Sequence, residues 1–424
     1  CRIAAGFVNM AAKLQPIRGT RDLLAEDCRA HARVEQACAE IACRYGYGEI
    51  RTPILEMTPV FARSLGCATD VVQKEMYTFE DRGGEQVTMR PENTASVARA
   101  VLSNGLLNEV PLKLYYAGPM FRYERPQKGR YRQFHQIGME LFGVPEPTGD
   151  IEIVAMGADV LDELGLMADT RLEINTLGDT ESRTRYREAL VAYLQQHQDA
   201  LSEDSKDRLE RNPMRVLDSK SEADKAIVAD APLIFDHLTD DAGSFFDSVL
   251  AGLDALGLAY EVNPRIVRGL DYYCHTAFEF ITEKLGSQGT VIGGGRYDGL
   301  MEQMGGPALP GVGWAGGIER LAMLAGGGDS VERPIALVPV GETAEHKALL
   351  IAHDLRRQGH RIELGYRGNL KRRMQRANKA GASHALILGD EELTRGVAIL
   401  RDLDSGEQTE LSIDRVSEGL PRRG

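Results

Sequence analysis

The sequence predicts an α+β protein: a largely antiparallel sheet that carries a helical insertion, followed by a separate C-terminal α/β domain. Short strand-like segments with mostly short connections lie between residues 49 and 142, which is typical of antiparallel pairing. Residues 178–257 are polar and helical in pattern, and strands alternate with helices after residue 334. A length of 424 residues allows two or three domains.

The first predicted element is a helix from Ala25 to Tyr45. Val34, Cys38, Ile41 and Tyr45 recur at a spacing of three to four residues, which places them on one helix face. The glycines at positions 46 and 48 end this helix. A strand is expected over residues 49–55, at a sheet edge or strand end because it contains proline.

The rest of the N-terminal region is expected to continue the sheet. One helix and several strands can be predicted there from the pattern of apolar residues. Strands are predicted at 76–80, 86–90, 112–122, 134–142, 261–268 and 273–282, with a helix at 94–106.

The insertion and the C-terminal domain differ in charge. Residues 178–257 hold 9 Lys and Arg against 17 Asp and Glu, whereas residues 334–424 hold 15 against 13. Three consecutive glycines at 326–328 predict a linker between the N-terminal and C-terminal parts. After it we expect strands at 335–340, 361–366, 385–388, 397–402 and 408–413, and helices at 343–358 and 369–379.

Composition excludes several classes of protein. No apolar run is long enough for a transmembrane helix, so no membrane association is expected, and residues 1–13 show no secretory cleavage pattern. The six cysteines form neither a disulfide framework nor a C-x-x-C pair, and no clustered ligands predict a metal site, which favours a reducing cytoplasm. The net charge of −13 argues against a polyanionic partner, unless cations gather locally.

Cations do gather at residues 121–132, where five basic residues accompany one acid. Pro126 and Gly129 predict a loop between two strands. An exposed charged hairpin would look similar, but the aromatic neighbours Tyr123, Tyr131 and Phe134 favour contact with a nucleotide or nucleic acid.

The strand after this loop can form the floor of a polar pocket. Alternation puts Gln136, Gly138 and Glu140 on one face and apolar residues on the other, and the glycine would leave room for a ligand. An ordinary half-exposed strand has the same pattern. Upstream, Glu92, Asn93 and Thr94 join a strand to a helix, where they could cap the helix or bind an amine.

Three further segments combine glycine with charged or phenolic side chains. They cover residues 268–273 (Arg-Gly-Leu-Asp-Tyr-Tyr), 287–299 and 311–320. None fits a P-loop or a dinucleotide-binding fingerprint. Residues 311–320 predict a glycine-rich strand leading into a helix that begins near Ile318, with Arg320 facing a ligand.

Together these motifs resemble the class II aminoacyl-tRNA synthetases, and among them the histidyl-tRNA synthetase family. Residues 45–53, 121–134 and 311–320 resemble motifs 1, 2 and 3 of the class. The segments 268–273 and 294–299 resemble signatures of the histidine-specific family, and 88–92 and 215–220 also match. The resemblance extends from about Gln15 to the C-terminus.

The resemblance implies a six-stranded antiparallel catalytic core with a helical insertion at 178–257. Residues 1–328 would form the catalytic domain, and residues 329–424 an α/β anticodon-binding domain. The implied protein is a homodimeric cytoplasmic ligase that forms histidyl-adenylate from histidine and ATP, accompanied by Mg²⁺. It then transfers the histidyl group to the 3′-terminal ribose of histidine tRNA.

The family also implies roles for individual residues. Arg122 and Arg268 would be catalytic, because cations must screen the attacking carboxylate and the α-phosphate. Histidine would contact Glu92, Asn93, Thr94, Arg122, Gln136, Glu140, Arg268, Tyr272 and Tyr273. ATP would contact Arg122, Glu124, Arg130, Phe134 and Arg320. The tRNA would contact Arg125, Gln127, Arg372, Arg373 and Arg376.

Two alternatives stay open. A non-catalytic relative, the regulatory subunit of ATP phosphoribosyltransferase, shares the catalytic fold but lacks the C-terminal domain. A related synthetase for threonine, proline or glycine would carry a similar C-terminal domain. One departure from the family is visible, since bacterial members often have glycine where this chain has Asn93.

Overall fold

The computed structural model describes residues 14–421, except 67–68, 128, 218, 220, 267–269, 271, 287–288 and 327–331. The chain forms two compact units, Cys1–Gly328 and Asp329–Gly424. We describe each unit by itself.

The larger unit is built on a mixed sheet of eight strands. In order across the sheet, the strands are β1 (Gly48–Glu49), β5 (Leu112–Phe121), β6 (Gln133–Phe142), β11 (Gly311–Gly317), β10 (Thr290–Arg296), β9 (Cys274–Ile281), β7 (Arg171–Thr176) and β8 (Tyr260–Val262). From β5 to β7, each strand is antiparallel to its neighbours, whereas β1 and β8 pair in parallel at the two edges. The predicted six antiparallel strands therefore describe the centre of the sheet, and the count is corrected to eight.

Two predicted strands are shorter than expected. The segment 49–55 divides into β1 and β2 (Leu55–Met57), and Pro53, which cannot donate a ladder hydrogen bond, lies in the break. Strand β2 belongs to a separate three-stranded sheet with β4 (Gln86–Met89) and β3 (Tyr77–Glu80). The predicted strand at 261–268 ends at Val262.

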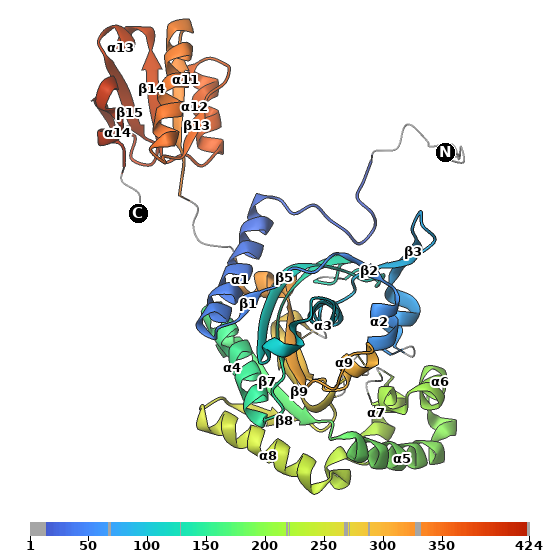
Figure 1. The fold of residues 1–424 in the computed structure, drawn as a ribbon. Helices are drawn as coiled ribbons and strands as arrows, with labels where there is room; N and C mark the ends of the chain where they lie inside the picture. Colours follow the sequence, from blue (N-terminus) through green and yellow to red (C-terminus); the bar gives the residue numbers. More distant parts are fainter. Residues whose placement is uncertain are drawn as a thin grey trace, which may run out of the picture. The chain divides into compact units, whose positions relative to one another are not determined.

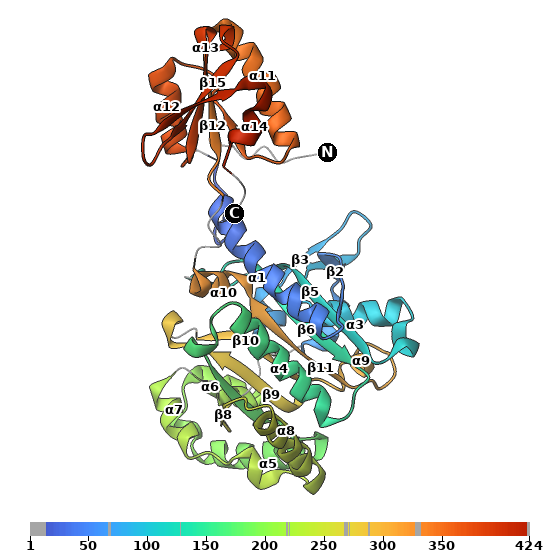
Figure 2. The ribbon, with the colours of Figure 1, turned by 90° about the vertical axis from the view of Figure 1, so that its left-hand side faces the viewer.

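The main sheet separates two hydrophobic cores (Figures 1 and 2). One face is covered by α1 (Ala25–Arg44), α4 (Pro147–Glu163), α8 (Asp240–Ala255) and α10 (Ile318–Ala325). The other face is covered by α2 (Pro59–Ser64), α3 (Thr94–Ser103) and α9 (Leu300–Gln303). Because side chains alternate along β6, Ile137 and Met139 enter the first core, which leaves Gln136 on the second face.

The predicted insertion forms a helical subregion of this unit (Figure 1). Its helices are α5 (Thr180–Gln196), α6 (Glu203–Arg211) and α7 (Glu222–Ala229), whereas α8, at the end of the predicted range 178–257, packs on the main sheet. They enclose a small core of their own, which includes Tyr186, Leu190, Leu209 and Val228. Most of its acidic side chains are exposed, but Asp224 is buried and accepts hydrogen bonds from Ser202, Ser205 and Ser219.

The smaller unit has a five-stranded sheet in the order β13 (Ile362–Leu364), β12 (Ile335–Val340), β14 (His384–Gly389), β15 (Val397–Asp402) and β16 (Gln408–Ser412). The first three strands are parallel to one another, whereas β15 and β16 pair antiparallel to their neighbours. The helices are α11 (Glu342–Arg357), α12 (Leu370–Lys379), α13 (Asp390–Thr394) and α14 (Val416–Gly419). Across the described residues of both units, no helix has the length and apolar character that crossing a bilayer requires.

Candidate active site

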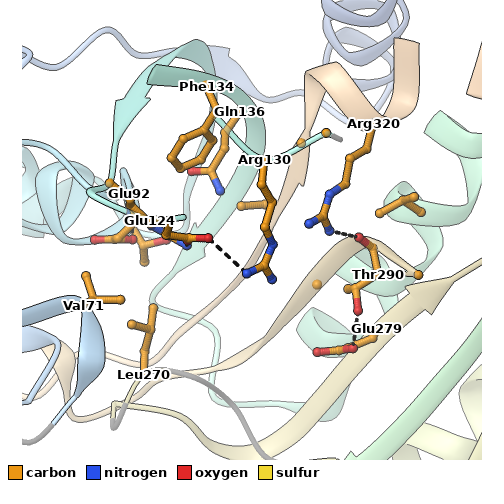
Figure 3. Close-up of a pocket in the computed structure, with 18 of the residues that line it drawn as sticks. Val71, Glu92, Glu124, Arg130, Phe134, Gln136, Leu270, Glu279, Thr290 and Arg320 are labelled. Atoms are coloured by element: carbon orange, nitrogen blue, oxygen red, sulfur yellow. Dashed lines mark hydrogen bonds and ion pairs between the residues drawn. The ribbon is translucent and has the colours of Figure 1, made fainter. Parts of the chain in front are cut away.

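A cavity of about 600 Å³ lies on the α3 side of the main sheet. It brings together most of the residues predicted to bind histidine and ATP (Figure 3). Those that line it are Glu92, Thr94, Arg122, Glu124, Arg130, Phe134, Gln136, Tyr272, Tyr273 and Arg320. They come from segments more than 200 residues apart, so the fold assembles a site that the sequence shows only in pieces.

Three arginines, Arg122, Arg130 and Arg320, line the cavity. The Arg122 Nε donates to the Pro91 carbonyl at 2.8 Å, and its guanidinium lies 5.2 Å from the centre of the Phe134 ring. Arg130 pairs with Glu124 at 3.0 Å, and Arg320 donates to the Thr290 carbonyl at 2.6 Å (Figure 3). Burial, with the charge of Arg130 nearby, lowers the pKa of Arg320 from its ordinary value. An anion entering here would relieve this repulsion.

Acceptors lie at the start of α3 and on β6. The Glu92 carboxylate accepts hydrogen bonds from the backbone N–H groups of Thr94, at 2.8 Å, and Ala95, at 2.9 Å. It therefore caps the helix and also lines the cavity. The Gln136 carbonyl oxygen is buried and has no hydrogen-bond partner among the described residues. Both groups can accept from an ammonium group.

Glu140 lies behind this layer rather than among the lining residues. Its carboxylate accepts from the Thr94 hydroxyl at 2.6 Å and from the Tyr297 hydroxyl, and it is fully buried. Burial raises the pKa of Glu140 to about 8, although both hydrogen bonds oppose the shift. Contact between this group and a ligand would require Thr94 or Tyr297 to release it.

Two glycines shape this floor. A Cβ at Gly138 would collide with the phenol of Tyr116 and lie 2.8 Å from the Trp314 carbonyl oxygen. A Cβ at Gly313 would collide with the Glu140 carboxylate. The space at Gly138 was predicted for a ligand, but Tyr116 occupies it.

Asn93 is not among the residues that line the cavity, and its predicted contact with histidine stays a prediction. It is buried, and its side-chain oxygen accepts from the Thr52 hydroxyl at 2.6 Å and from Arg90 at 3.1 Å. Its φ of −115° is not left-handed, so the position does not require glycine. We assign Asn93 to positioning the turn that carries Glu92 and Thr94.

The predicted tRNA-contacting residues have different surroundings. Arg125 and Gln127 are exposed on the loop between β5 and β6. In the C-terminal unit, Arg372 and Arg376 are exposed on α12. Arg373 is only 3% exposed and bonds to the Pro339 carbonyl and Glu345, so its predicted RNA contact is corrected. Arg268, predicted to be catalytic, lies outside the described residues.

Sequence reasoning missed several polar residues that line the same cavity. They are Glu173, Asn263, Arg265, Glu279, Thr290 and Glu319. Glu279 had a readable signal, because it alternates with Phe278 and Phe280, whose rings enter the opposite core. The Thr290 hydroxyl donates to the Glu279 carboxylate at 2.8 Å, and its carbonyl accepts from Arg320, which links β9 and β10 to the basic side (Figure 3).

The site therefore has two chemically different ends. Guanidinium groups suit phosphate and carboxylate oxygens, and Phe134 offers an aromatic face beside them. Glu92 and Gln136 suit a cationic amine. A zwitterionic amino acid and a nucleoside triphosphate satisfy both ends at once.

Comparisons with known proteins point the same way. The family model described as histidyl-tRNA synthetase matches residues 19–321, and the one described as anticodon binding domain matches residues 335–423. The histidine–tRNA ligase of Gluconacetobacter diazotrophicus is 57% identical over 407 residues, which cover 96% of this chain and 98% of the relative.

Two solved structures resemble the chain. The S. aureus histidyl-tRNA synthetase is 35% identical with a TM-score of 0.80, covering 96% of this chain and 99% of that one. A Bacillus halodurans structure titled ATP phosphoribosyltransferase regulatory subunit/histidyl-tRNA synthetase is 22% identical with a TM-score of 0.64, covering 89% and 98%. The second likeness concerns the fold alone. The family match and the 57% identity over nearly the whole length establish that the chain belongs to the histidyl-tRNA synthetase family.

Proposed function

We propose that this chain is an ATP-dependent histidine–tRNA ligase whose activation step takes place in the cavity between α3 and the main sheet. One observation carries the proposal beyond family membership: Arg122, Arg130 and Arg320 converge on the cavity that also holds Glu92 and Gln136. Substrate carboxylate and phosphates therefore have cations beside them, and the substrate amine has acceptors.

In the first step, a carboxylate oxygen of histidine attacks the α-phosphorus of ATP. The new P–O bond forms as the bond to the β-phosphate oxygen breaks, giving histidyl-adenylate and pyrophosphate. Arg122 and Arg268 screen the repulsion between the two anions, whereas Arg130 and Arg320 hold the outer phosphates. The protein acts by positioning and charge stabilisation, and needs no nucleophile of its own.

Phe134 supplies a face for adenine, beside Arg122. Glu124 contributes through its pairing with Arg130, which orients that guanidinium toward the phosphates. ATP arrives as its Mg²⁺ complex. The carboxylates of Glu124 and Glu279 line the same cavity and are the hard oxygen ligands that Mg²⁺ prefers.

Histidine selectivity comes from buried polar groups. Tyr272 and Tyr273 line the cavity, and Glu140 lies one hydrogen bond behind Thr94. We assign Glu140 and Tyr273 to the two imidazole nitrogens, with Thr94 moving its hydroxyl to the substrate amine. An amino acid without these nitrogens would leave buried groups unpaired, which can discriminate by roughly 10⁴ or more.

The second step passes the histidyl group to the 3′-terminal ribose of histidine tRNA. Arg125 and Gln127 lie exposed on the loop beside the cavity, where they can reach the acceptor end. The exposed side chains of Arg372 and Arg376 would bind phosphates in the anticodon region of the tRNA. We keep a homodimer and a cytoplasmic location within the proposal; the described cysteines are free thiols, as in a reducing compartment.

Exchange of pyrophosphate into ATP tests the proposal. The purified full chain should catalyse exchange with histidine and not with threonine, proline or glycine. No exchange with any of these, from folded protein that still binds histidine, would identify a regulatory relative. Exchange supported by proline or threonine would show that Glu140 and Tyr273 do not select a substrate by its imidazole ring.

A further inference from the structure

A second cluster of ligand-type side chains lies on the opposite side of β6 from Gln136. His31 is on α1, His135 on β6 and Glu319 in the first turn of α10, where Glu319 also lines the active-site cavity. Alternation along β6 explains the position, because residue 135 faces α1 and α10 whereas residues 134 and 136 face the active site. Three distant segments thus bring two imidazoles and a carboxylate together.

The donor atoms are close enough to share an ion. His135 Nδ1 is hydrogen-bonded to Glu319 Oε1 at 2.9 Å, a contact that a shared ion would replace, and the two imidazole rings meet edge to face with their centres 5.2 Å apart. One donor atom from each residue lies within 4.8 Å of the other two. Bonds of about 2.0–2.2 Å to a tetrahedral ion place its donors roughly 3.3–3.5 Å apart. Small side-chain rotations close the remaining gap.

His31 provides an independent sign that a partner is missing. Its side chain is 6% exposed, yet its Nε2 is buried without a hydrogen-bond partner among the described residues. A buried polar atom left unpaired costs about 1–3 kcal/mol. Nothing in the activation chemistry uses the His31 side chain, and a cation bound among the three residues would give this imidazole a partner.

Glu319 is already oriented as a ligand. Both of its carboxylate oxygens lie 3.0 Å from the backbone nitrogen of His135, which donates to them. Supporting hydrogen bonds of this kind are a usual feature of metal sites, because they fix the ligand's orientation.

A cavity of about 320 Å³ adjoins the cluster and leaves room for a fourth ligand. His135 and Glu319 line it, together with Thr20, Arg21 and Asp22. The Arg21 guanidinium would repel a cation, but it is drawn toward Asp27 at 3.1 Å. Three protein ligands with an open water position are a common arrangement for zinc, and imidazole with carboxylate favours Zn²⁺ over Mg²⁺ or Ca²⁺.

We propose that His31, His135 and Glu319 bind a divalent transition-metal ion, with Zn²⁺ as the best fit. The ion would fasten α1 to β6 and α10. It would act next to the active site, because residue 135 lies between Phe134 and Gln136 and residue 319 precedes Arg320. Its effect on the cavity would be to hold these neighbouring side chains in place.

Metal titration of the chelator-treated full chain tests this site without relying on activity. Zn²⁺ is titrated in competition with a chromophoric chelator, and Co²⁺ is used as a visible-light probe of ligand geometry. We expect one equivalent at micromolar affinity or tighter, with a Co²⁺ spectrum typical of four-coordinate nitrogen and oxygen ligation.

Two substitutions of the cluster and one control decide the assignment. His31→Gln should weaken binding by at least about 10-fold, as loss of a supporting partner alone already does. His31→Phe keeps an aromatic ring at this position without a metal-binding nitrogen, and it should weaken binding by a similar factor. Agreement between the two variants would show that the loss does not come from a folding defect in one of them. His346→Gln, at an exposed position of α11, should bind as the parent does. Absence of the four-coordinate Co²⁺ spectrum, or parental affinity in both His31 variants, would overturn the proposal.

Discussion

The active-site cavity and helix α12 both carry several arginines, but the two regions hold them differently. In the cavity, Arg122, Arg130 and Arg320 bond to acceptors on neighbouring segments, which fixes their guanidinium groups around a shared space. On α12, Arg372 and Arg376 are exposed, with Arg376 donating to the Arg367 carbonyl at 3.1 Å, whereas Arg373 turns inward to Glu345. The number of cations in a segment therefore predicts a polyanionic partner only where the orientation of their side chains is known.

The largest expected effect concerns Arg268, whose role rests on the family. Arg268→Ala should abolish histidine-dependent pyrophosphate exchange while histidine still binds measurably, because its cation acts on charge that develops during the reaction. Exchange is measured beside histidine binding by calorimetry. Near-normal exchange by the variant would contradict the assigned role.

Arg122→Ala tests whether a fixed guanidinium in the cavity matters more than an exposed one. We expect kcat/KM for exchange to fall by about 10²–10³-fold, the usual cost of one preorganised donor. Arg122→Lys should recover part of the lost kcat/KM, because lysine keeps the positive charge but lacks the planar guanidinium that bonds to two oxygens at once. Arg372→Ala is the matched control and should exchange normally. If the Arg122 and Arg372 substitutions lowered kcat/KM equally, the arginines of the cavity would have no special role in exchange.

The buried carboxyl group of Glu140 should make the stability of the protein depend on pH. Burial raises its pKa to about 8, against about 4.3 in an unfolded chain. Between these values the folded protein keeps a proton that the unfolded chain has released, so the free energy of unfolding falls as pH rises. Glu140→Gln removes this dependence, and its stability relative to the parent should rise by roughly 2–4 kcal/mol from pH 5 to pH 8.

Urea unfolding without ligands can follow this difference at Trp314. It is the only tryptophan in the chain, and it lies on β11 beside β6. Parallel pH profiles for the parent and Glu140→Gln would show that Glu140 is ionised in the folded protein.

Arg373 tests the inward-facing member of α12. Arg373→Ala removes the donor that bonds to the Pro339 carbonyl and to Glu345. Because Glu345 is half exposed, water can solvate its carboxylate, and the loss of unfolding free energy is smaller than for a fully buried pair. We expect local stability of the C-terminal unit to fall by about 1–3 kcal/mol. Hydrogen exchange over residues 335–389 measures the loss, and the Trp314 transition should stay unchanged. Parental protection in the variant would show that the buried pair is not stabilising.

The smallest effect is expected from the exposed arginines. The double substitution Arg372→Ala with Arg376→Ala should weaken tRNA binding about 10-fold at low salt. It should also reduce the slope of log affinity against log salt by about 1 to 2, as expected for two phosphate contacts. Pyrophosphate exchange should not change. An unchanged salt slope would remove α12 as an RNA-binding surface.

Much of the fold and the site was readable from the sequence, because local patterns carried the information. The alternation of Gln136 with Ile137 and Met139 gave the correct face of β6, and the helix after Gly317 begins as predicted. Strand β10 was missed because it contains three consecutive glycines, which strands usually avoid, and its neighbours β9 and β11 supply the pairing.

Other features depended on contacts between distant segments. Arg373 looked like its basic neighbours, although its spacing of four from the buried Ala377 was a readable sign. The surroundings of Asn93 depend on Arg90 and Thr52, which no local pattern joins. His31, His135 and Glu319 lie in three separate elements, so a search for clustered metal ligands along the sequence could not find them.

A crystal structure of the chain with histidine and a non-hydrolysable ATP analogue tests the central assignment most directly. We predict that the imidazole lies between Glu140 and Tyr273, that the substrate amine meets Glu92 and Gln136, and that Arg122 contacts both the carboxylate and the α-phosphate. The assignment would be wrong if Glu140 kept its hydrogen bond to Thr94 while the imidazole or the α-phosphate was bound outside this cavity.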